Sequence, residues 1–395
     1  MRILVFPRDL ELGGSSINAI DLAAAVRLYD HEPVIFSSPG PLEDRLAELD
    51  LIFEPVQLPT SPRPSPRVIR SLAAAIRSHR IDLVHTYEYW PCVEALYGSA
   101  LLSGRPVLST IMSMDLPSYL PRSIPLTLGT RDLIRSAERM RTAAAFLLEP
   151  PIDTQLDHPG IDAGWLSAGV LTVVIVSRVA ASMKQEGIER TIDAVGDLGR
   201  RQEIRLLVVG DGSAMGAIQQ TAARINQSLG REVVVMTGAM NDPRPAYSAA
   251  DIVVGMGSSV LRGMAFGKPA IVVGEQGFTL PVTPETMPTF ERTGFYGIDA
   301  GRLPEAEDPL SGYLAQLADN PGRRRELGEF GRKLVHERYS LDTMARALDR
   351  IYRETRQSAP SLARRATDGF LTGARVARHK AAGRGLLRQA RRRTD

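Results

Sequence analysis

The sequence predicts an α/β protein with two doubly wound domains, each a parallel sheet covered by helices on both faces. Short apolar runs rich in β-branched residues recur along the chain, and segments of helical periodicity separate them. One irregular stretch divides this series into two. The length of 395 residues suits two domains of ordinary size, each with its own hydrophobic core.

Composition indicates a globular protein, with 44% hydrophobic and 24% charged residues. No apolar run could span a bilayer, and the opening MRILVFP is better explained as a strand than as a signal segment, so we expect a cytoplasmic protein. The single cysteine, Cys92, excludes an internal disulfide and a cysteine-based metal cluster. The six histidines lack metal-ligand spacing and no D-x-D occurs, so we expect no bound metal.

The first domain is predicted over residues 1–160. An apolar strand at residues 2–6 runs into the glycine pair Gly13-Gly14 and then a helix at about 17–29, with Ser15 and Ser16 as N-caps. A strand at 33–37 follows a short turn, so the unit is βαβ and the sheet is parallel. Further strands are expected at residues 81–85, 106–110, 126–129 and 145–148.

An irregular linker at residues 149–169, with three prolines and three glycines, precedes the second domain, which we place at 161–335. A C-terminal helix that packs back on the body is expected at 336–358, followed by a basic tail at 359–395. The second domain repeats the alternation of strand and helix, with strands expected at residues 171–177, 204–210, 232–237, 251–254 and 270–273.

The stretch of residues 251–273 predicts a strand, a glycine turn, a short helix and a second strand. Gly255-Met256-Gly257 lets the backbone turn tightly, and Ser258 or Ser259 is expected to cap the helix. A helix N-terminus approached by a glycine turn suits phosphate, because its N–H groups and partial positive charge point outward. An ordinary βαβ corner is an equally good interpretation.

Two cations follow the first strand of the second domain. Arg178 comes directly after this strand and Lys184 lies six residues on, in the loop before a helix. Such a pair can neutralise a diphosphate leaving group, although a surface Arg and Lys would be the usual explanation. In the first domain, His85 closes a predicted strand where ligands bind in open α/β sheets, either as a reactive or as a structural histidine.

The glycines after the strand at 204–210 do not predict a nicotinamide site. Gly210, Gly212 and Gly216 have a spacing one residue too long for the dinucleotide fingerprint, and the acidic residue expected at the end of the next strand is missing.

The basic tail contrasts with the body. Residues 361–395 hold ten Lys/Arg and two Asp/Glu, which predicts an anionic partner for the tail and no nucleic acid for the body. Peripheral association with an anionic membrane at its inner face is one interpretation. A disordered, solvated tail is the other, because Gly369, Gly373, Gly383 and Gly385 weaken helix formation.

Five segments together resemble a glycosyltransferase of family 4. They are the turn Gly13-Gly14, SRVAASMKQEGIERTIDAV (177–195), VVGDGSA (208–214), AYSAADIVV (246–254) and GMGSSVLRGMAFGKPAIV (255–272). The resemblance covers roughly residues 1 to 355 and implies two Rossmann-like domains facing a cleft, the arrangement called GT-B. It implies metal-independent, retaining transfer from a nucleotide-diphosphate sugar, a co-substrate, with no other cofactor.

The resemblance also implies roles for single residues. The second domain would hold the donor and the first the acceptor. Arg178 and Lys184 would bind the donor diphosphate, Gly13 and Gly14 would approach it from the first domain, and His85 matches the family's strand-end histidine. The donor-binding set would be completed by backbone groups of Gly210, Gly255, Met256, Gly257, Ser258 and Ser259.

The sequence departs from the family at two places. The family's pair of glutamates falls on Val254 and Arg262, and an arginine cannot accept a hydrogen bond from ribose hydroxyls as the second glutamate does. The histidine of the family's T-x-H falls on Met112. Glu275, just beyond a predicted strand, is an alternative carboxylate for the donor.

Arg262 has its own difficulty if Ser259 caps the helix. It would then lie in the first turn, where a cation opposes the helix dipole by about 0.3–1 kcal/mol. A bound phosphate would remove the conflict, and a solvent-facing or Glu-paired arginine is the alternative.

We therefore expect a hexosyltransferase of the kind used in polysaccharide biosynthesis, acting on a glycan, lipid-linked glycan or small-metabolite acceptor. Two alternatives remain at this point. One is a catalytically degenerate relative that acts as a binding partner, and the other is a sugar-nucleotide epimerase of the same architecture.

Overall fold

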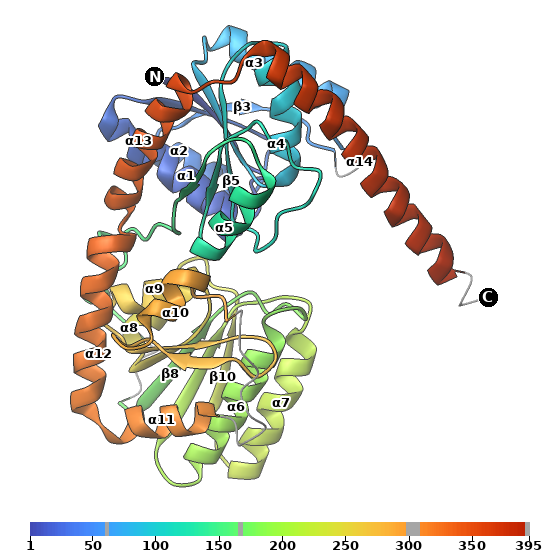
Figure 1. Ribbon diagram of the computed structural model, residues 1–395. Helices are drawn as coiled ribbons and strands as arrows, with labels where there is room; N and C mark the ends of the chain where they lie inside the picture. Colours follow the sequence, from blue (N-terminus) through green and yellow to red (C-terminus); the bar gives the residue numbers. More distant parts are fainter. Residues whose placement is uncertain (60–62, 165–168, 298–308, 392–395) are drawn as a thin grey trace. The chain divides into compact units, whose positions relative to one another are not determined.

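The computed structural model describes residues 1–59, 63–164, 169–297 and 309–391, with the backbone alone described for 383–391. Part of the predicted linker (165–168) and the end of the tail (392–395) lie outside the described residues. The chain divides into two compact units (Figure 1). Unit 1 comprises Met1–Pro150 and Leu341–Asp395, and unit 2 comprises Pro151–Ser340. The first boundary thus falls ten residues before the one expected from the sequence.

Unit 1 contains a seven-stranded, fully parallel sheet with the order β3-β2-β1-β4-β5-β6-β7. Alternate residues of its interior strand β1 enter different cores: Ile3 and Val5 pack on one face and Leu4 and Phe6 on the other. The strands are β1 (Arg2–Phe6), β2 (Glu32–Ser37), β3 (Ile52–Pro55), β4 (Leu83–Tyr87), β5 (Val107–Ile111), β6 (Leu126–Leu128) and β7 (Ala145–Leu147). The sequence did not predict β3, which has the most exposed pattern of the seven.

Helices cover both faces of this sheet (Figure 1). Among them, α13 packs on α1, where Leu348 and Tyr352 join the core formed by β1 and β4. The helices of unit 1 are α1 (Gly14–Ala25), the 3-10 helix η1 (Val26–Tyr29), α2 (Glu43–Glu48), α3 (Pro66–Ser78), α4 (Tyr89–Ala95), the π-helix η2 (Leu96–Leu101), α5 (Arg131–Met140), α13 (Leu341–Gln357) and α14 (Leu362–Arg391).

Unit 2 contains a six-stranded sheet with the order β10-β9-β8-β11-β12-β13, parallel except for the last strand. The sequence predicted the five parallel strands and missed the short antiparallel edge. The strands are β8 (Leu171–Val176), β9 (Ile204–Val209), β10 (Val234–Gly238), β11 (Ile252–Gly255), β12 (Ala270–Val273) and β13 (Thr279–Pro281). The helices are α6 (Gln185–Gly199), α7 (Met215–Leu229), α8 (Arg244–Ala249), α9 (Ser258–Ala265), α10 (Met287–Thr293), α11 (Pro309–Asp319), α12 (Pro321–Leu334) and the π-helix η4 (Val335–Tyr339).

The described part of the basic tail forms the long helix α14, so of the two interpretations of the tail the disordered one does not fit residues 362–391. Two of the glycines that weaken the helix in isolation, Gly369 and Gly373, lie against η2. A Cβ at Gly369 would lie 2.9 Å from Leu101 Cδ1, and one at Gly373 would lie 3.3 Å from the Tyr97 hydroxyl. Close packing against unit 1 therefore outweighs low helix propensity.

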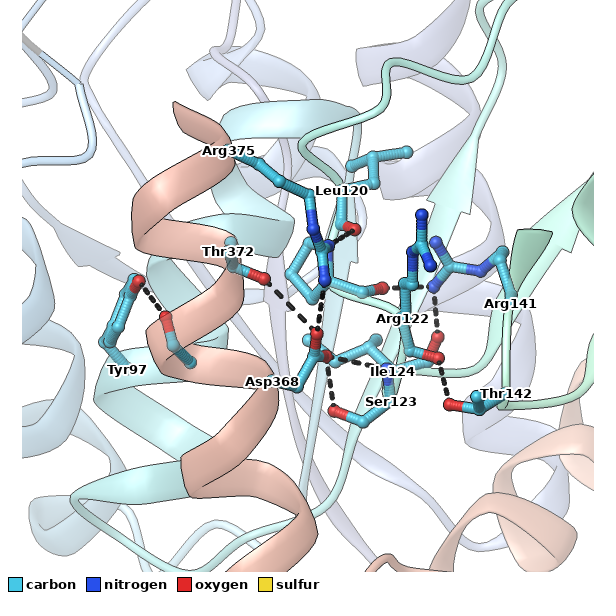
Figure 2. A network of polar contacts seen from close by, with 12 residues as sticks. Tyr97, Leu120, Arg122, Ser123, Ile124, Arg141, Thr142, Asp368, Thr372 and Arg375 are labelled. Atoms are coloured by element: carbon cyan, nitrogen blue, oxygen red, sulfur yellow. Dashed lines mark hydrogen bonds and ion pairs between the residues drawn. The ribbon is translucent and has the colours of Figure 1, made fainter. Parts of the chain in front are cut away.

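A buried carboxylate fixes α14 to unit 1 (Figure 2). Asp368 is 6% exposed, and its Oδ2 accepts hydrogen bonds from the Ser123 backbone N–H and hydroxyl, both at 2.7 Å. Arg375 donates to the Leu120 carbonyl at 3.2 Å and faces Asp368 at 3.5 Å. These contacts hold the proline-rich loop after β5, and the later part of α14 extends away from unit 1 (Figure 1).

Within the described residues, no helix combines the length and hydropathy needed to cross a membrane.

Candidate functional site

The loop between β8 and α6 carries both predicted phosphate-binding cations of unit 2. It packs backbone to backbone on the turn after β9: a Cβ at Gly210 would collide with the Ser177 carbonyl oxygen, and one at Gly212 would collide with that of Val179. Both glycines have positive φ, of 140° and 158°. Gly210 therefore acts in the fold by allowing the loop with Arg178 to lie against the end of β9.

Arg178 and Lys184 lie close enough to influence each other electrostatically. Burial, with a smaller contribution from the Arg178 cation, lowers the pKa of Lys184 to about 8. Arg178 is exposed, and neither side chain forms an ion pair with any described residue. A half-buried ammonium beside a guanidinium, without a carboxylate partner, forms a site whose charge an anion would neutralise.

The turn after β12 joins the same site. Glu275 Oε1 accepts a hydrogen bond from the Met183 N–H at 2.8 Å, one residue before Lys184. Glu186 in the first turn of α6 accepts from the N–H groups of Gln276 and Gly277 at 3.0 and 2.7 Å. The structure thus brings Glu275 to the Arg178–Lys184 loop, as a carboxylate that also holds this loop in place.

The glycine turn after β11 leads directly into α9, but the predicted serine caps are wrong. The N-cap is Gly257, with φ 66°, and no side chain caps this helix. Ser258 and Ser259 are already helical, and the Ser259 hydroxyl donates back to the Met256 carbonyl at 2.9 Å. Glycine occupies the cap because its backbone conformation is one that other residues rarely adopt.

The predicted conflict of Arg262 with the helix dipole is also wrong. Because α9 begins at Ser258 and ends at Ala265, Arg262 lies in its last turn, where a cation is favourable. Its Nε lies 3.4 Å from Oδ2 of Asp157, whose side chain is 4% exposed. The linker segment thus supplies the carboxylate that faces Arg262, and no phosphate is needed to explain the arginine.

In unit 1, the turn Gly13-Gly14 meets the N-terminus of α1, and here too the predicted serine caps are wrong. Gly13 is the N-cap, Ser15 Oγ donates to Glu88 at 3.3 Å and Ser16 Oγ to Asp9 at 3.2 Å. A Cβ at either glycine would meet no atom within 4 Å. The space beside the turn is therefore open, and packing within unit 1 does not require glycine there.

His85 does not lie at a ligand-accessible edge. Strand β4 extends to Tyr87, so His85 is inside the sheet and fully buried. Its Nδ1 lies 2.8 Å from the Tyr352 hydroxyl and its Nε2 lies 2.7 Å from Thr110 Oγ1. Burial lowers its pKa to about 3. These contacts are those of a buried histidine that stabilises the fold. They do not fit the alternative prediction that His85 reacts with substrate.

Sequence reasoning missed Glu88, the residue directly after β4. Its backbone has φ 68° and ψ −176°, a region occupied almost only by glycine that costs other residues about 1–3 kcal/mol. The residue is 8% exposed, and burial raises the pKa of its carboxyl group. An acidic residue directly after a buried strand, at the edge where ligands bind, was the available sequence signal.

Among the described residues, no group of three or more His, Cys, Asp or Glu side chains could hold a metal ion.

Comparisons with known proteins agree with this architecture. The model of glycosyl transferases group 1 matches residues 171–287, and that of glycosyltransferase family 4 matches residues 12–146. No curated protein sequence matches the chain.

Solved structures share the fold over nearly the whole chain at low sequence identity. A glycosyltransferase from Rickettsia africae is 18% identical, with a TM-score of 0.71, over 90% of this chain and 99% of its own. Anabaena Alr3699/HepE in complex with UDP is 15% identical, with a TM-score of 0.66, over 90% of this chain and 100% of its own. The two sheets, the two glycine turns and these matches together make the chain a family 4-like glycosyltransferase with the GT-B fold.

Proposed function

We propose that this chain transfers a hexosyl group from a nucleotide-diphosphate sugar to a hydroxyl of a glycan, lipid-linked glycan or small metabolite. The transfer retains the anomeric configuration and uses no metal ion. The observation that carries the proposal is the pair Arg178 and Lys184, which lies at the strand ends of unit 2 without an ion-pair partner among the described side chains. HepE was solved with UDP and with UDP-glucose, so UDP-sugars are the first donors to test.

In this mechanism the bond between the anomeric carbon and the β-phosphate oxygen breaks while a bond to the acceptor oxygen forms. Negative charge collects on the leaving diphosphate, where Arg178 and Lys184 stabilise it more strongly than in the ground state. The acceptor proton passes to the departing phosphate oxygen. The backbone N–H groups of Ser258 and Ser259 add donors at the N-terminus of α9.

The test is incubation of the purified protein with UDP-, GDP- and ADP-sugars, with and without glycan and lipid-linked acceptors. We expect acceptor-dependent release of one nucleotide and a product whose anomeric configuration, read by NMR, matches the donor. EDTA should leave the rate unchanged. Donor conversion to an epimer without any acceptor would indicate an epimerase, and binding of nucleotide without turnover would indicate a degenerate relative.

We also propose that the outward face of α14 binds an anionic membrane surface. The only acidic residue in 362–391 is Asp368, which is buried against unit 1. The outward face instead carries exposed Phe370, 79% exposed, together with Leu371 and Arg378. Apolar and basic side chains without acidic neighbours favour an anionic lipid surface.

Co-sedimentation with vesicles tests this attachment without deleting the docked helix. We expect binding to phosphatidylglycerol vesicles and none to pure phosphatidylcholine, with Phe370→Ser weakening it. Leu28→Ser is the matched control, because Leu28 is also 79% exposed but lies in η1. Equal binding to both vesicles, or no binding to either, would contradict the proposal.

A further inference from the structure

Glu88 joins three loops that follow adjacent strands of unit 1. Its Oε1 accepts from Ser15 Oγ at 3.3 Å and from the Met112 N–H at 3.1 Å, and its Oε2 accepts from Ser113 Oγ at 2.7 Å. Ser15 follows the glycine turn after β1, whereas Met112 and Ser113 follow β5. The carboxylate therefore lies at the carboxyl edge of the sheet, where ligands bind in open α/β folds.

The Glu88 carboxylate can accept a further hydrogen bond. A carboxylate offers about four acceptor positions, and the described residues take three of them, two on Oε1 and one on Oε2. The longest of the three bonds comes from Ser15, next to the open space over Gly13 and Gly14. A hydroxyl entering that space can donate to Glu88, on Oε2 or in place of the Ser15 bond.

The backbone supports a role beyond the fold. Glycine would fit the conformation of residue 88 without strain, yet the chain carries a glutamate with its side chain buried. Strained residues of this kind cluster at ligand sites, because the surrounding structure must hold them there. The same edge carries Met112 where the resembling family has a histidine, and the Met112 N–H donates to the Glu88 carboxylate.

We propose that Glu88 binds the acceptor, with its carboxylate accepting a hydrogen bond from a hydroxyl of a neutral sugar or polyol placed over Gly13-Gly14. This inference rests on the proposed function and names the acceptor class. A carboxylate in this position excludes an acceptor that presents phosphate or carboxylate at the reacting end, because like charges repel. Glu88 orients the nucleophilic oxygen of the acceptor. The bonds that break and form are those given above for the transfer of the hexosyl group.

Charged and titratable neighbours set the pH dependence of the site. Burial, the largest effect, raises the pKa of Glu88, whereas the hydrogen bonds from Ser113, Met112 and Ser15, and then the charge of Arg8, lower it. Tyr89 lies within electrostatic reach and is bonded to Asp115. Because burial raises the pKa of Glu88, this residue becomes protonated at a higher pH than an exposed glutamate does. Acceptor binding should therefore weaken at that higher pH.

The experiment measures binding of p-nitrophenyl hexosides to the full chain by saturation-transfer NMR, in wild type, Glu88→Gln and Ser113→Ala. We expect Glu88→Gln to bind about tenfold more weakly, since a hydrogen bond to a charged acceptor is replaced by one to a neutral amide oxygen. Ser113→Ala keeps the charge and should stay within about threefold of wild type. Wild-type affinity should fall as the pH is lowered, and Glu88→Gln should show no such fall.

Two controls separate this inference from others. The affinity for UDP, measured by calorimetry, should be unchanged in Glu88→Gln, because the donor belongs to unit 2. Failure of wild type to bind UDP would therefore contradict the proposed function and not the acceptor site. Equal hexoside binding by wild type and Glu88→Gln, identical pH profiles, or no hexoside binding by wild type would overturn the acceptor proposal.

Discussion

Lys184 carries a charge that its burial disfavours, and replacing it by methionine tests both the cost of this charge and its proposed role in binding the donor. Burial and Arg178 lower its pKa from 10.5 to about 8. The protein therefore keeps a disfavoured charge at pH 7. Lys184→Met retains much of the side-chain volume and removes the charge, so the folded protein should become more stable while its affinity for a nucleoside diphosphate falls.

The size of the stability gain follows from the pKa shift. A change from 10.5 to about 8 corresponds to about 3 kcal/mol of penalty on the charged form. Because Lys184 is partly exposed to water, we expect a gain of about 1–2 kcal/mol at pH 7. That gain should raise the melting temperature of unit 2 by about 2–4 °C per kcal/mol. The lost charge-assisted hydrogen bond should weaken UDP binding about ten- to a hundredfold.

The stability difference between wild type and Lys184→Met should depend on pH. The folded-state pKa lies below the unfolded value, so between about pH 8 and 10.5 the unfolded chain holds more protons. Wild-type stability should therefore rise over that interval and the advantage of Lys184→Met should disappear. UDP affinity of wild type should fall over the same interval as Lys184 loses its charge.

Differential scanning calorimetry and titration calorimetry with UDP measure the two quantities. Lys268→Met is the matched control: burial also lowers the pKa of Lys268, but this residue precedes β12, at the opposite end of the strand from Glu275. Its UDP affinity should match wild type. The reasoning is refuted if Lys184→Met is less stable than wild type at pH 7, or if it binds UDP equally well.

Three further substitutions test separate parts of the account. Gly210→Ala should displace the loop with Arg178 and weaken UDP binding at least tenfold by calorimetry, and unchanged affinity would show that the close contact with Ser177 is not needed. Asp368→Asn should lower the free energy of unfolding by about 1–3 kcal/mol in urea, because it removes the charge that accepts both Ser123 bonds, and an unchanged midpoint would contradict the docking of α14. Arg262→Ala removes the cation that faces the buried carboxylate of Asp157. It should lower the free energy of unfolding by about 1–3 kcal/mol in the same assay. Unchanged stability would mean that this ion pair is dispensable.

Much of the fold could be predicted because hydrophobic periodicity marks buried parallel strands. Strands β1 and β12 have the predicted bounds, and the ends of the other predicted strands lie within two residues of those observed. Strand β3 was missed because Ile52 is exposed and its pattern is short. The antiparallel β13 was missed for a similar reason, since three residues carry no detectable period.

The conformation of the tail and the helix N-caps could not be predicted from local sequence alone. Glycines in α14 weaken a helix in water, but at Gly369 and Gly373 they permit contact with η2, which depends on residues far away in the sequence. Serine is the usual cap, yet Gly13 and Gly257 occupy the N-cap positions.

Candidate site residues were predictable when they sit next to a strand end. Arg178, Lys184 and Glu275 lie together because β8 and β12 end at the same edge of one sheet. His85 was misplaced because β4 continues two residues further than expected. For Glu88 the only signal in the sequence was its place directly after a predicted strand, because its strained backbone angle and its hydrogen bond with Ser113 exist only in the folded chain.

Donor turnover by wild type and Arg178→Ala tests the central claim most directly. Both proteins would be incubated with the panel of nucleotide sugars together with the glycan and lipid-linked acceptors, and released nucleoside diphosphate would be measured. The account predicts release by wild type from one class of donor and its loss in Arg178→Ala, with the same circular dichroism spectrum. Equal release by both proteins, or no release by wild type from any donor, would contradict it.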